Sequence, residues 1–260
     1  MLYLFCLLLC LTTGQTNQTS QTNQTPSEQP TKTQSLPAVV KRTIPSGGRK
    51  RIFYLFVPAS VANDKPAPLV VLLHPSGGDG QYLIKRWQDL ANREGFLLAG
   101  PDALNSDHWS APVDGPDFLR DVVEAVRAEH TIDRRRVYLF GFSAGAGFAI
   151  NMSLLQSEYF AATAAFASVN FKEQFAEMAA RKIPFSFTVG VQDEIFSIAD
   201  ARAGRDGLRA HGFPVEWKEI ANAGHDYATY AAAVNQAAWE FFKQHELAAD
   251  PQYRDYQFRK

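Results

Sequence analysis

The sequence contains only two cysteines, Cys6 and Cys10, and both lie in an apolar segment at the N-terminus. If that segment is removed as a leader, the remaining chain contains no thiol. A disulfide framework, a cysteine nucleophile and a cysteine-ligated metal site are then excluded for the folded part of the protein. Export of such a chain would not depend on oxidative folding.

An excess of charge of one sign is also missing. Lysine and arginine together number 26, aspartate and glutamate together 27, and the formal net charge is −1. We therefore expect neither nucleic acid nor an anionic membrane surface as a partner.

Sequence motifs for metal or nucleotide chemistry are absent as well. The chain has no H-E-x-x-H sequence, and its glycine-rich segment at residues 77–80 lacks the lysine of a P-loop. A dinucleotide-binding pattern that began at Gly145 would need glycine where Ile150 stands. We therefore expect no metal and no cofactor.

The continuous apolar segment at residues 2–11 is too short to cross a bilayer and is typical of a signal-peptide core. We predict a signal peptide at residues 1–14, a secreted or periplasmic protein, and no stable membrane insertion after processing. No lysine or arginine precedes Lys32, which leaves an uncleaved hydrophobic tail as the alternative. Phe5 and Leu9, which precede the two cysteines, are too large for a typical lipoprotein signal.

Composition divides the rest of the chain into three parts. Residues 15–37 are polar and repetitive, with the sequence T-N-Q-T occurring twice, and we predict a disordered linker there. Residues 38–248 contain the apolar patterns of a folded domain, and overall 46% of residues are hydrophobic, enough for a full core. Residues 249–260 are predicted to form a polar, solvated C-terminal tail.

Within the predicted domain, short apolar segments alternate with amphipathic ones. We predict strands at residues 51–57, 69–73, 96–99, 137–140, 185–189 and 215–220. We predict helices at residues 81–94, around 118–126 and at 227–246. This alternation indicates the α/β class, with a mostly parallel central sheet covered by helices on both faces. Ligand chemistry is then expected at the carboxyl ends of the strands.

The most informative motif is G-F-S-A-G at residues 141–145, which follows a predicted strand and precedes a segment of small residues. A serine at a sharp turn from strand to helix exposes its hydroxyl, and the flanking glycines are needed where the chain crowds its neighbours. The helix N-terminus that follows favours negative charge. We therefore predict that Ser143 is a nucleophile.

A serine nucleophile needs a base and a carboxylate that orients the base. Of the six histidines, His225 is the best candidate, because it follows the predicted strand at residues 215–220. Asp193 follows the strand at residues 185–189, and neighbouring Glu194 is its competitor. The chain order serine, aspartate, histidine is that of the α/β-hydrolase fold.

The oxyanion of an acyl-transfer intermediate needs two N–H donors. The residue after the nucleophile, Ala144, is one expected donor. The second should come from the loop after the strand at residues 69–73, where Pro75 has no N–H. Ser76 is our first choice for this donor and Gly77 the second. His74, at the end of the same strand, is expected to order the loop by hydrogen bonds.

In these features the chain resembles the secreted polyhydroxybutyrate depolymerase and feruloyl esterase group of α/β-hydrolases. The resemblance covers roughly residues 49–245 and rests on the following motifs: L-L-H at residues 72–74, Asp133, R-V-Y at 136–138, G-F-S-A-G at 141–145, Trp109, and D-F-L at 117–119. It implies a serine esterase that acts outside the cytoplasm on polyesters or on phenolic esters of plant walls.

The expected function is therefore hydrolysis of small-molecule or polymeric carboxylic esters by Ser143, His225 and Asp193. We expect His108 and Trp109, in the long loop before residue 117, to line the substrate cleft. A serine peptidase or an acyltransferase on the same fold is the alternative enzyme. A non-catalytic binding protein is a third possibility, although binding alone would require none of the three residues.

Overall fold

The computed structural model describes residues 37–61 and 65–256. The predicted leader at residues 1–14, and the predicted linker except for its last residue, lie outside the described residues. The strands of the described part are β1 (Val40–Ser46), β2 (Arg49–Phe56), β3 (Ala67–Leu73), β4 (Leu97–Pro101), β5 (Ile132–Phe142), β6 (Ala162–Phe166), β7 (Phe185–Gly190) and β8 (Val215–Ile220). Its helices are α1 (Gly80–Glu94), α2 (Pro116–Glu129), α3 (Ala144–Leu155), α4 (Glu173–Met178), α5 (Ile198–Ala210) and α6 (Tyr227–Phe242).

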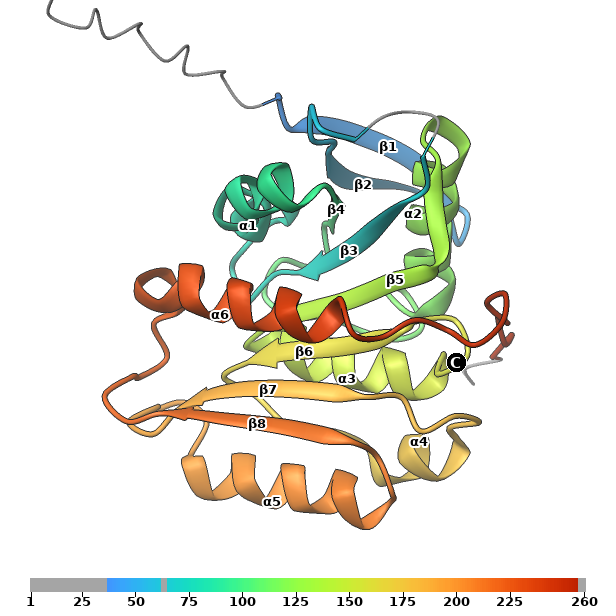
Figure 1. Cartoon of the computed structure of the whole chain (residues 1–260). Coiled ribbons are helices and arrows are strands. Elements are labelled where there is room, and N and C mark those ends of the chain that lie inside the picture. Colours follow the sequence, from blue (N-terminus) through green and yellow to red (C-terminus); the bar gives the residue numbers. More distant parts are fainter. Residues whose placement is uncertain (1–36, 62–64, 257–260) are drawn as a thin grey trace, which may run out of the picture. The chain divides into compact units, whose positions relative to one another are not determined.

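The strands form one sheet in the order β1-β2-β4-β3-β5-β6-β7-β8 (Figure 1). The pairs from β4 through β8 are all parallel, whereas β1 and β2 pair in antiparallel fashion at one edge. The predicted mostly parallel sheet is confirmed. Because the parallel strands all end at the same edge, the loops that follow β3, β5, β7 and β8 lie at that edge together.

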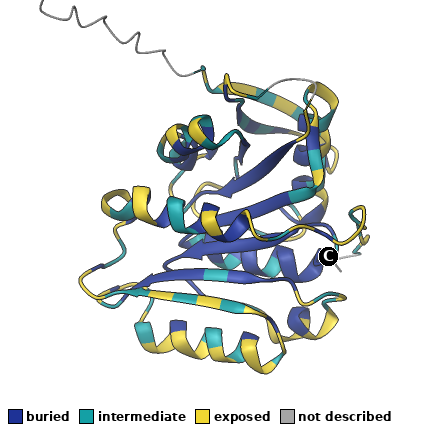
Figure 2. Ribbon diagram, viewed as in Figure 1, coloured by how far each residue is buried: buried dark blue, intermediate teal, exposed yellow. Residues whose placement is uncertain are grey.

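Helices cover both faces of this sheet, as predicted. In β3, the side chains of Leu69, Val71 and Leu73 pack with α2 and α3, whereas those of Val70 and Leu72 pack with α1 and α6. The strand is buried on both faces, which explains its unbroken apolar sequence (Figure 2). The result is two apolar cores with the sheet between them.

The predicted helices and strands all form, with boundaries that shift by a few residues. Sequence analysis predicted no strand at β1 or β6 and gave no bounds for a helix at α4 or α5. β6 has the sequence A-T-A-A-F, in which alanine supplies little strand signal. It is a strand because it pairs with β5 and β7 in the middle of the sheet.

The segment after residue 248 was expected to be a polar, solvated tail. In its described part most residues are exposed, and Gln252, Arg254 and Tyr256 also contact the domain. Gln156, which is buried, donates from its side-chain amide to the Arg254 carbonyl at 2.6 Å and accepts from the Arg254 N–H at 3.1 Å. The Tyr256 hydroxyl donates to the Leu155 carbonyl at 2.6 Å. Both contacts hold the segment against the C-terminal end of α3.

Among the helices that the structure describes, none combines the length and the apolar character needed to cross a membrane.

Candidate active site

Three residues that are far apart in the sequence meet at the carboxyl edge of the sheet. Ser143 directly follows β5, Asp193 follows β7, and His225 follows β8. The Ser143 Oγ lies 2.8 Å from the His225 Nε2, and the His225 Nδ1 lies 2.8 Å from the Asp193 Oδ2. The structure thus places all three predicted residues in one hydrogen-bonded chain.

Ser143 occupies a strained turn. Its backbone angles are φ 57° and ψ −119°, in a region that residues other than glycine rarely adopt. A Cβ at Gly141 would lie 2.2 Å from the Gly145 carbonyl oxygen, and a Cβ at Gly145 would lie 2.0 Å from the Leu73 carbonyl oxygen. Both glycines are therefore required for the close approach of β5, α3 and β3. Strain of this kind is characteristic of functional sites.

Asp193 is held in one orientation by its own loop. Its Oδ1 accepts hydrogen bonds from the N–H groups of Ile195 and Phe196, both at 2.9 Å. Its Oδ2 is left for His225, and its side chain is only 1% exposed. Glu194 is exposed and forms no hydrogen bond with His225 in the described structure.

These bonds define where the imidazole proton lies. An ionised carboxylate only accepts hydrogen bonds, so the His225 Nδ1 must donate to Asp193. The Nε2 atom is then free to accept the proton of the Ser143 hydroxyl. Phe142 and Phe196 pack against the imidazole, with ring centroids at 5.1 and 5.6 Å, and they restrict its rotation.

Two backbone N–H groups near Ser143 have no partner within the part of the chain that the structure describes. Among the described residues, neither the Ser76 N–H nor the Ala144 N–H donates a hydrogen bond, and both residues line a cavity of about 540 Å³ that also contacts Ser143. The Gly77 N–H, by contrast, donates to the Ser106 carbonyl at 2.8 Å. Of the two residues considered for the second donor, only Ser76 has its N–H available.

His74 faces its own loops and not Ser143. Its Nδ1 donates to the Pro75 carbonyl at 2.8 Å, and its Nε2 accepts from the Ala103 N–H at 3.1 Å. The ring is buried against Trp109, with centroids 4.7 Å apart, and the Trp109 Nε1 donates to the His74 carbonyl. His74 therefore joins the loop after β3 to the loop after β4, in agreement with the expectation that it orders its loop.

His108 and Trp109 both line a cavity of about 290 Å³ that reaches Ser143 from the α3 side. Trp109 is half-buried and stacks on Phe148 with ring centroids 5.2 Å apart, whereas His108 is exposed at the rim. Ser143 thus lies between two cavities, because the 540 Å³ cavity opens on its other side.

The loop that carries Trp109 is fixed by a buried ion pair that the sequence did not reveal. Arg51 and Asp114 lie 2.6 Å apart, with side chains 3% and 1% exposed. Asp114 also accepts from the N–H groups of Leu104 and Ser110. The two charged residues are 63 positions apart in the sequence, and no local pattern links an arginine on β2 to a carboxylate in a loop.

At the end of β4, Asp102 accepts a hydrogen bond from the Gly80 N–H at 2.8 Å. Burial raises the pKa of its carboxyl group, and the bond from Gly80 opposes that rise. Among the described residues there is no group of three histidine, cysteine, aspartate or glutamate side chains that is suited to hold a metal ion.

The model of the dienelactone hydrolase family matches residues 54–250. The chain belongs to this family. The bifunctional acetylxylan esterase/xylanase XynS20E of Neocallimastix patriciarum is 28% identical over 156 residues, which are 58% of this chain and 22% of that protein. Poly(3-hydroxyalkanoate) depolymerase C of Paucimonas lemoignei is 26% identical over 205 residues, which are 73% of this chain and 48% of that protein. The matched region covers less than half the length of either relative.

The solved structure of a ferulic acid esterase has a TM-score of 0.67 and 20% identity to this chain, and the match covers 80% of this chain and 98% of that one. With the mostly parallel sheet, this similarity shows the α/β-hydrolase fold. The predicted resemblance to polyhydroxybutyrate depolymerases and feruloyl esterases is confirmed by these matches.

Proposed function

We propose that this dienelactone hydrolase family member hydrolyses carboxylic esters through a covalent acyl-serine intermediate. The observation that carries the proposal is the continuous hydrogen-bonded chain from Ser143 through His225 to Asp193. The serine stands on a strained turn whose flanking glycines admit no side chain. These are the parts that nucleophilic acyl transfer requires.

In the first half of the proposed reaction, the Ser143 Oγ attacks the ester carbonyl carbon while its proton passes to the His225 Nε2. The Asp193 carboxylate stabilises the imidazolium that forms. The carbonyl oxygen becomes an oxyanion, which the N–H groups of Ala144 and Ser76 stabilise. When the carbon–oxygen bond breaks, the alcohol takes the proton from His225 and leaves an acyl ester on Ser143.

In the second half, a water molecule attacks the acyl carbon and gives a proton to the His225 Nε2. The same N–H donors stabilise the second oxyanion. The bond to the Ser143 Oγ then breaks, the serine recovers its proton from His225, and the carboxylic acid departs. Neither half requires a cofactor or a metal ion.

The proposed substrates are small-molecule or polymeric esters of the polyester or feruloyl type, because related proteins are named poly(3-hydroxyalkanoate) depolymerase and feruloyl esterase. The cavities on both sides of Ser143 support this, since an ester needs room for an acyl group and for an alcohol group. The 290 Å³ cavity has aromatic walls, including Trp109 and Phe148, that suit an apolar group. We propose that the protein acts in a secreted or periplasmic location, on the basis of the predicted leader.

A fluorophosphonate probe and a panel of p-nitrophenyl esters test this proposal directly. We expect the wild-type protein to be labelled and to hydrolyse at least one ester, and Ser143→Ala to lose both properties while it stays folded. Ser60→Ala, which changes an exposed serine away from the site, is the matched control and should keep both. Labelling that persists in Ser143→Ala would place the nucleophile elsewhere.

Assays of the same wild-type protein distinguish ester hydrolysis from the alternative functions. Cleavage of an amide in preference to the matched ester would indicate a peptidase, and transfer of the acyl group to an added alcohol in preference to water would indicate an acyltransferase. A wild-type protein that is neither labelled nor active on any ester would indicate a non-catalytic binding protein.

A further inference from the structure

The two cavities that reach Ser143 differ in their relation to His225. We call the cavity of about 290 Å³ the Trp109 cavity and the cavity of about 540 Å³ the Tyr82 cavity, after one residue that lines each. Ser143 and Phe196 line both cavities, but His225 lines only the Tyr82 cavity. An ester that occupies both cavities therefore has one substituent beside the imidazole and the other on the α3 side of Ser143.

The position of His225 decides which substituent lies beside it. When the bond from the acyl carbon to the alcohol oxygen breaks, the His225 Nε2 must give its proton to that oxygen. A group that transfers a proton in this way lies within about 2.6–3.2 Å of its partner. The alcohol oxygen therefore lies beside the imidazole, and the rest of the alcohol extends into the Tyr82 cavity.

The place of the acyl group follows from the oxyanion. In the tetrahedral intermediate the reacting carbon is bonded to the Ser143 Oγ, the alcohol oxygen, the oxyanion and the acyl group. In the proposed mechanism the N–H groups of Ala144 and Ser76 hold the oxyanion. Neither Ser76 nor His225 lines the Trp109 cavity, so this cavity is the space that remains for the acyl group.

The walls of the two cavities predict different selectivities. The Trp109 cavity is lined by the buried rings of Phe148 and Phe175. The Tyr82 cavity has Ile195 in its wall, and this residue is 67% exposed. A close-packed wall discriminates by size, because one methylene group too many forces its side chains to move. We therefore expect the size of the acyl group to affect the reaction more than the size of the alcohol.

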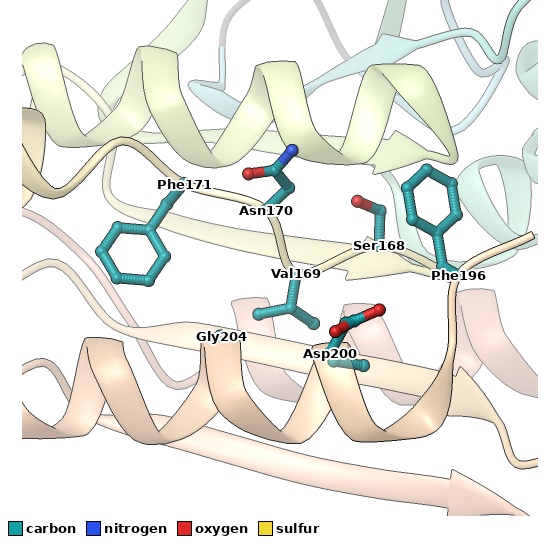
Figure 3. A pocket seen from close by; sticks show the side chains of 8 residues that line it. Ser168, Val169, Asn170, Phe171, Phe196, Asp200 and Gly204 are labelled. Carbon is teal, nitrogen blue, oxygen red and sulfur yellow. The ribbon is translucent and has the colours of Figure 1, made fainter.

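Gly147, near the start of α3, lines the Trp109 cavity. A Cβ there would lie 3.6 Å from the Asn170 carbonyl oxygen and 3.7 Å from the Ser168 Oγ, which are ordinary contacts. Ser168 and Asn170 line the same cavity. Figure 3 shows both residues, with Phe196, on a wall that a neighbouring cavity of about 360 Å³ shares, and the Asn170 side chain points towards α3. A methyl group at residue 147 would therefore narrow the Trp109 cavity without a clash.

Ile195 is held at the Tyr82 cavity by the carboxylate of Asp193. The N–H groups of Ile195 and Phe196 both donate to the Asp193 Oδ1 at 2.9 Å, which fixes the backbone of this segment. The exposed Ile195 side chain is left to contact a ligand. Alanine at this position keeps both bonds, and a substitution at an exposed residue has little effect on stability.

We propose that the Trp109 cavity binds the acyl group of the substrate and that the Tyr82 cavity binds its alcohol group. The inference rests on the proposed ester hydrolysis at Ser143 and adds the residues that set its specificity. Gly147 leaves room for large acyl groups, and Ile195 contacts the alcohol group. After the alcohol has left, the Tyr82 cavity admits the water molecule that attacks the acyl carbon, while the acyl group stays in the Trp109 cavity.

Two pairs of esters test this assignment. The acyl pair is p-nitrophenyl acetate and p-nitrophenyl 3-phenylpropanoate, which share their alcohol. The alcohol pair is the methyl ester and the benzyl ester of one acid, the acid that the p-nitrophenyl panel shows to be hydrolysed best, and its hydrolysis is followed by acid release at constant pH. For each pair we measure the ratio of kcat/KM for the larger ester to that for the smaller one.

The two cavities are altered one at a time. In Gly147→Ala we expect the acyl ratio to fall about tenfold, as for one methyl group too many in a close-packed pocket, and the alcohol ratio to keep its wild-type value. In Ile195→Ala we expect the alcohol ratio to fall about threefold, because part of an apolar contact is lost, and the acyl ratio to keep its wild-type value. Glu194→Gln is the matched control, because Glu194 is exposed, adjoins Ile195 and lines neither cavity. It should leave both ratios unchanged.

The reverse pattern, in which Gly147→Ala changes the alcohol ratio and Ile195→Ala the acyl ratio, would overturn the assignment. An acyl ratio that stays unchanged in Gly147→Ala would overturn it too, and so would a fall of the same ratio in both variants. Failure of the proposed function is distinguishable, since it would appear in the wild-type protein as missing fluorophosphonate labelling and missing p-nitrophenyl ester hydrolysis before any ratio is measured.

Discussion

The two oxygens of Asp193 have different partners. Replacement of one oxygen by an NH₂ group, as in Asp193→Asn, therefore changes the group that faces His225. Oδ1 accepts from the N–H groups of Ile195 and Phe196, and Oδ2 faces the His225 Nδ1. In Asp193→Asn, the remaining oxygen must stay with the two backbone N–H groups. The new NH₂ group therefore faces His225, whose Nδ1 must accept, which moves the imidazole proton to Nε2.

With its proton on Nε2, His225 cannot accept the proton of Ser143. We therefore expect Asp193→Asn to lower kcat by up to about 10⁴, the size of the effect for the equivalent change in a serine protease. Measurement of kcat on a p-nitrophenyl ester, with circular dichroism to confirm folding, checks this. Glu194→Gln is the matched control, because Glu194 is exposed, and it should change kcat little. The reverse pattern would assign the orienting carboxylate to Glu194.

At the scale of single residues, the sequence was sufficient where a residue's role follows from its place at a strand end. Ser143, Asp193 and His225 each follow a strand that could be predicted, and they meet in the structure. Sequence analysis ranked Ser76 before Gly77 as the second donor and left both open. The contact that separates them, the bond from the Gly77 N–H to the Ser106 carbonyl, joins two loops that have no common pattern.

At the scale of elements, α3 offers two glycines with opposite surroundings. A Cβ at Gly145 would lie 2.0 Å from the Leu73 carbonyl oxygen, but a Cβ at Gly147 would meet its nearest atom at 3.6 Å, an ordinary contact. We expect Gly145→Ala to destabilise the protein by about 3 kcal/mol because the helix must move from β3. We expect Gly147→Ala to stabilise it by about 0.5–1 kcal/mol through helix propensity.

Urea unfolding of the two variants measures both effects in the same helix. If Gly145→Ala were as stable as the wild type, the close approach of α3 to β3 would not be a requirement of the fold. Activity is not the readout here, because Gly147 lines the cavity at Ser143.

The loop between β4 and α2 depends on one buried carboxylate. Asp114 accepts from Arg51, Leu104 and Ser110, so its removal leaves a buried guanidinium and two backbone N–H groups without that partner. We expect Asp114→Ala to destabilise the protein by about 3–5 kcal/mol. Because this loop carries Trp109 into the cleft, KM for aromatic esters should also rise.

Denaturant titration and steady-state kinetics test the two parts of this prediction. Asp107→Ala is the matched control, since Asp107 lies in the same loop and is exposed, and it should leave both quantities near the wild-type values. A stable Asp114→Ala variant with an increased KM would limit the role of Asp114 to positioning the loop.

The elements that sequence analysis found and missed differ in how they are stabilised. β3 has an unbroken apolar sequence and α2 has an apolar helical periodicity, so local pattern was enough to predict them. β6 is composed mainly of alanine and α4 has only six residues, so both depend on neighbours distant in sequence. Tertiary pairing, which local propensity does not encode, decides such segments.

At the scale of the whole molecule, the alternation of strands and helices was enough to predict a sheet with helices on both faces. The loop-to-loop contacts and the position of the chain end were not predictable in this way. Residues 249–260 are polar, and a polar sequence indicates exposure to solvent. It does not exclude hydrogen bonds from backbone groups, which every sequence possesses. The Arg254 backbone makes two such bonds with the buried Gln156.

The C-terminal segment is expected to contribute to the stability of the domain. Removal of residues 251–260 deletes the two bonds between Gln156 and Arg254, and the bonds from Tyr256 to Leu155 and from Gln252 to Glu158. Each bond contributes about 0.5–1.5 kcal/mol, and the regained freedom of the chain offsets part of the sum. We expect the truncated protein to be less stable by roughly 2 kcal/mol in urea unfolding, because these contributions exceed the entropy gained.

The matched control is the same truncation in a Gln156→Ala background. If the segment is held through Gln156, truncation should destabilise the Gln156→Ala protein less than the wild type, because the bonds between Gln156 and Arg254 are already absent. Equal losses in the two backgrounds would show that Gln156 contributes nothing to docking. A truncated protein as stable as the wild type would show that the segment is the solvated tail that its composition predicts.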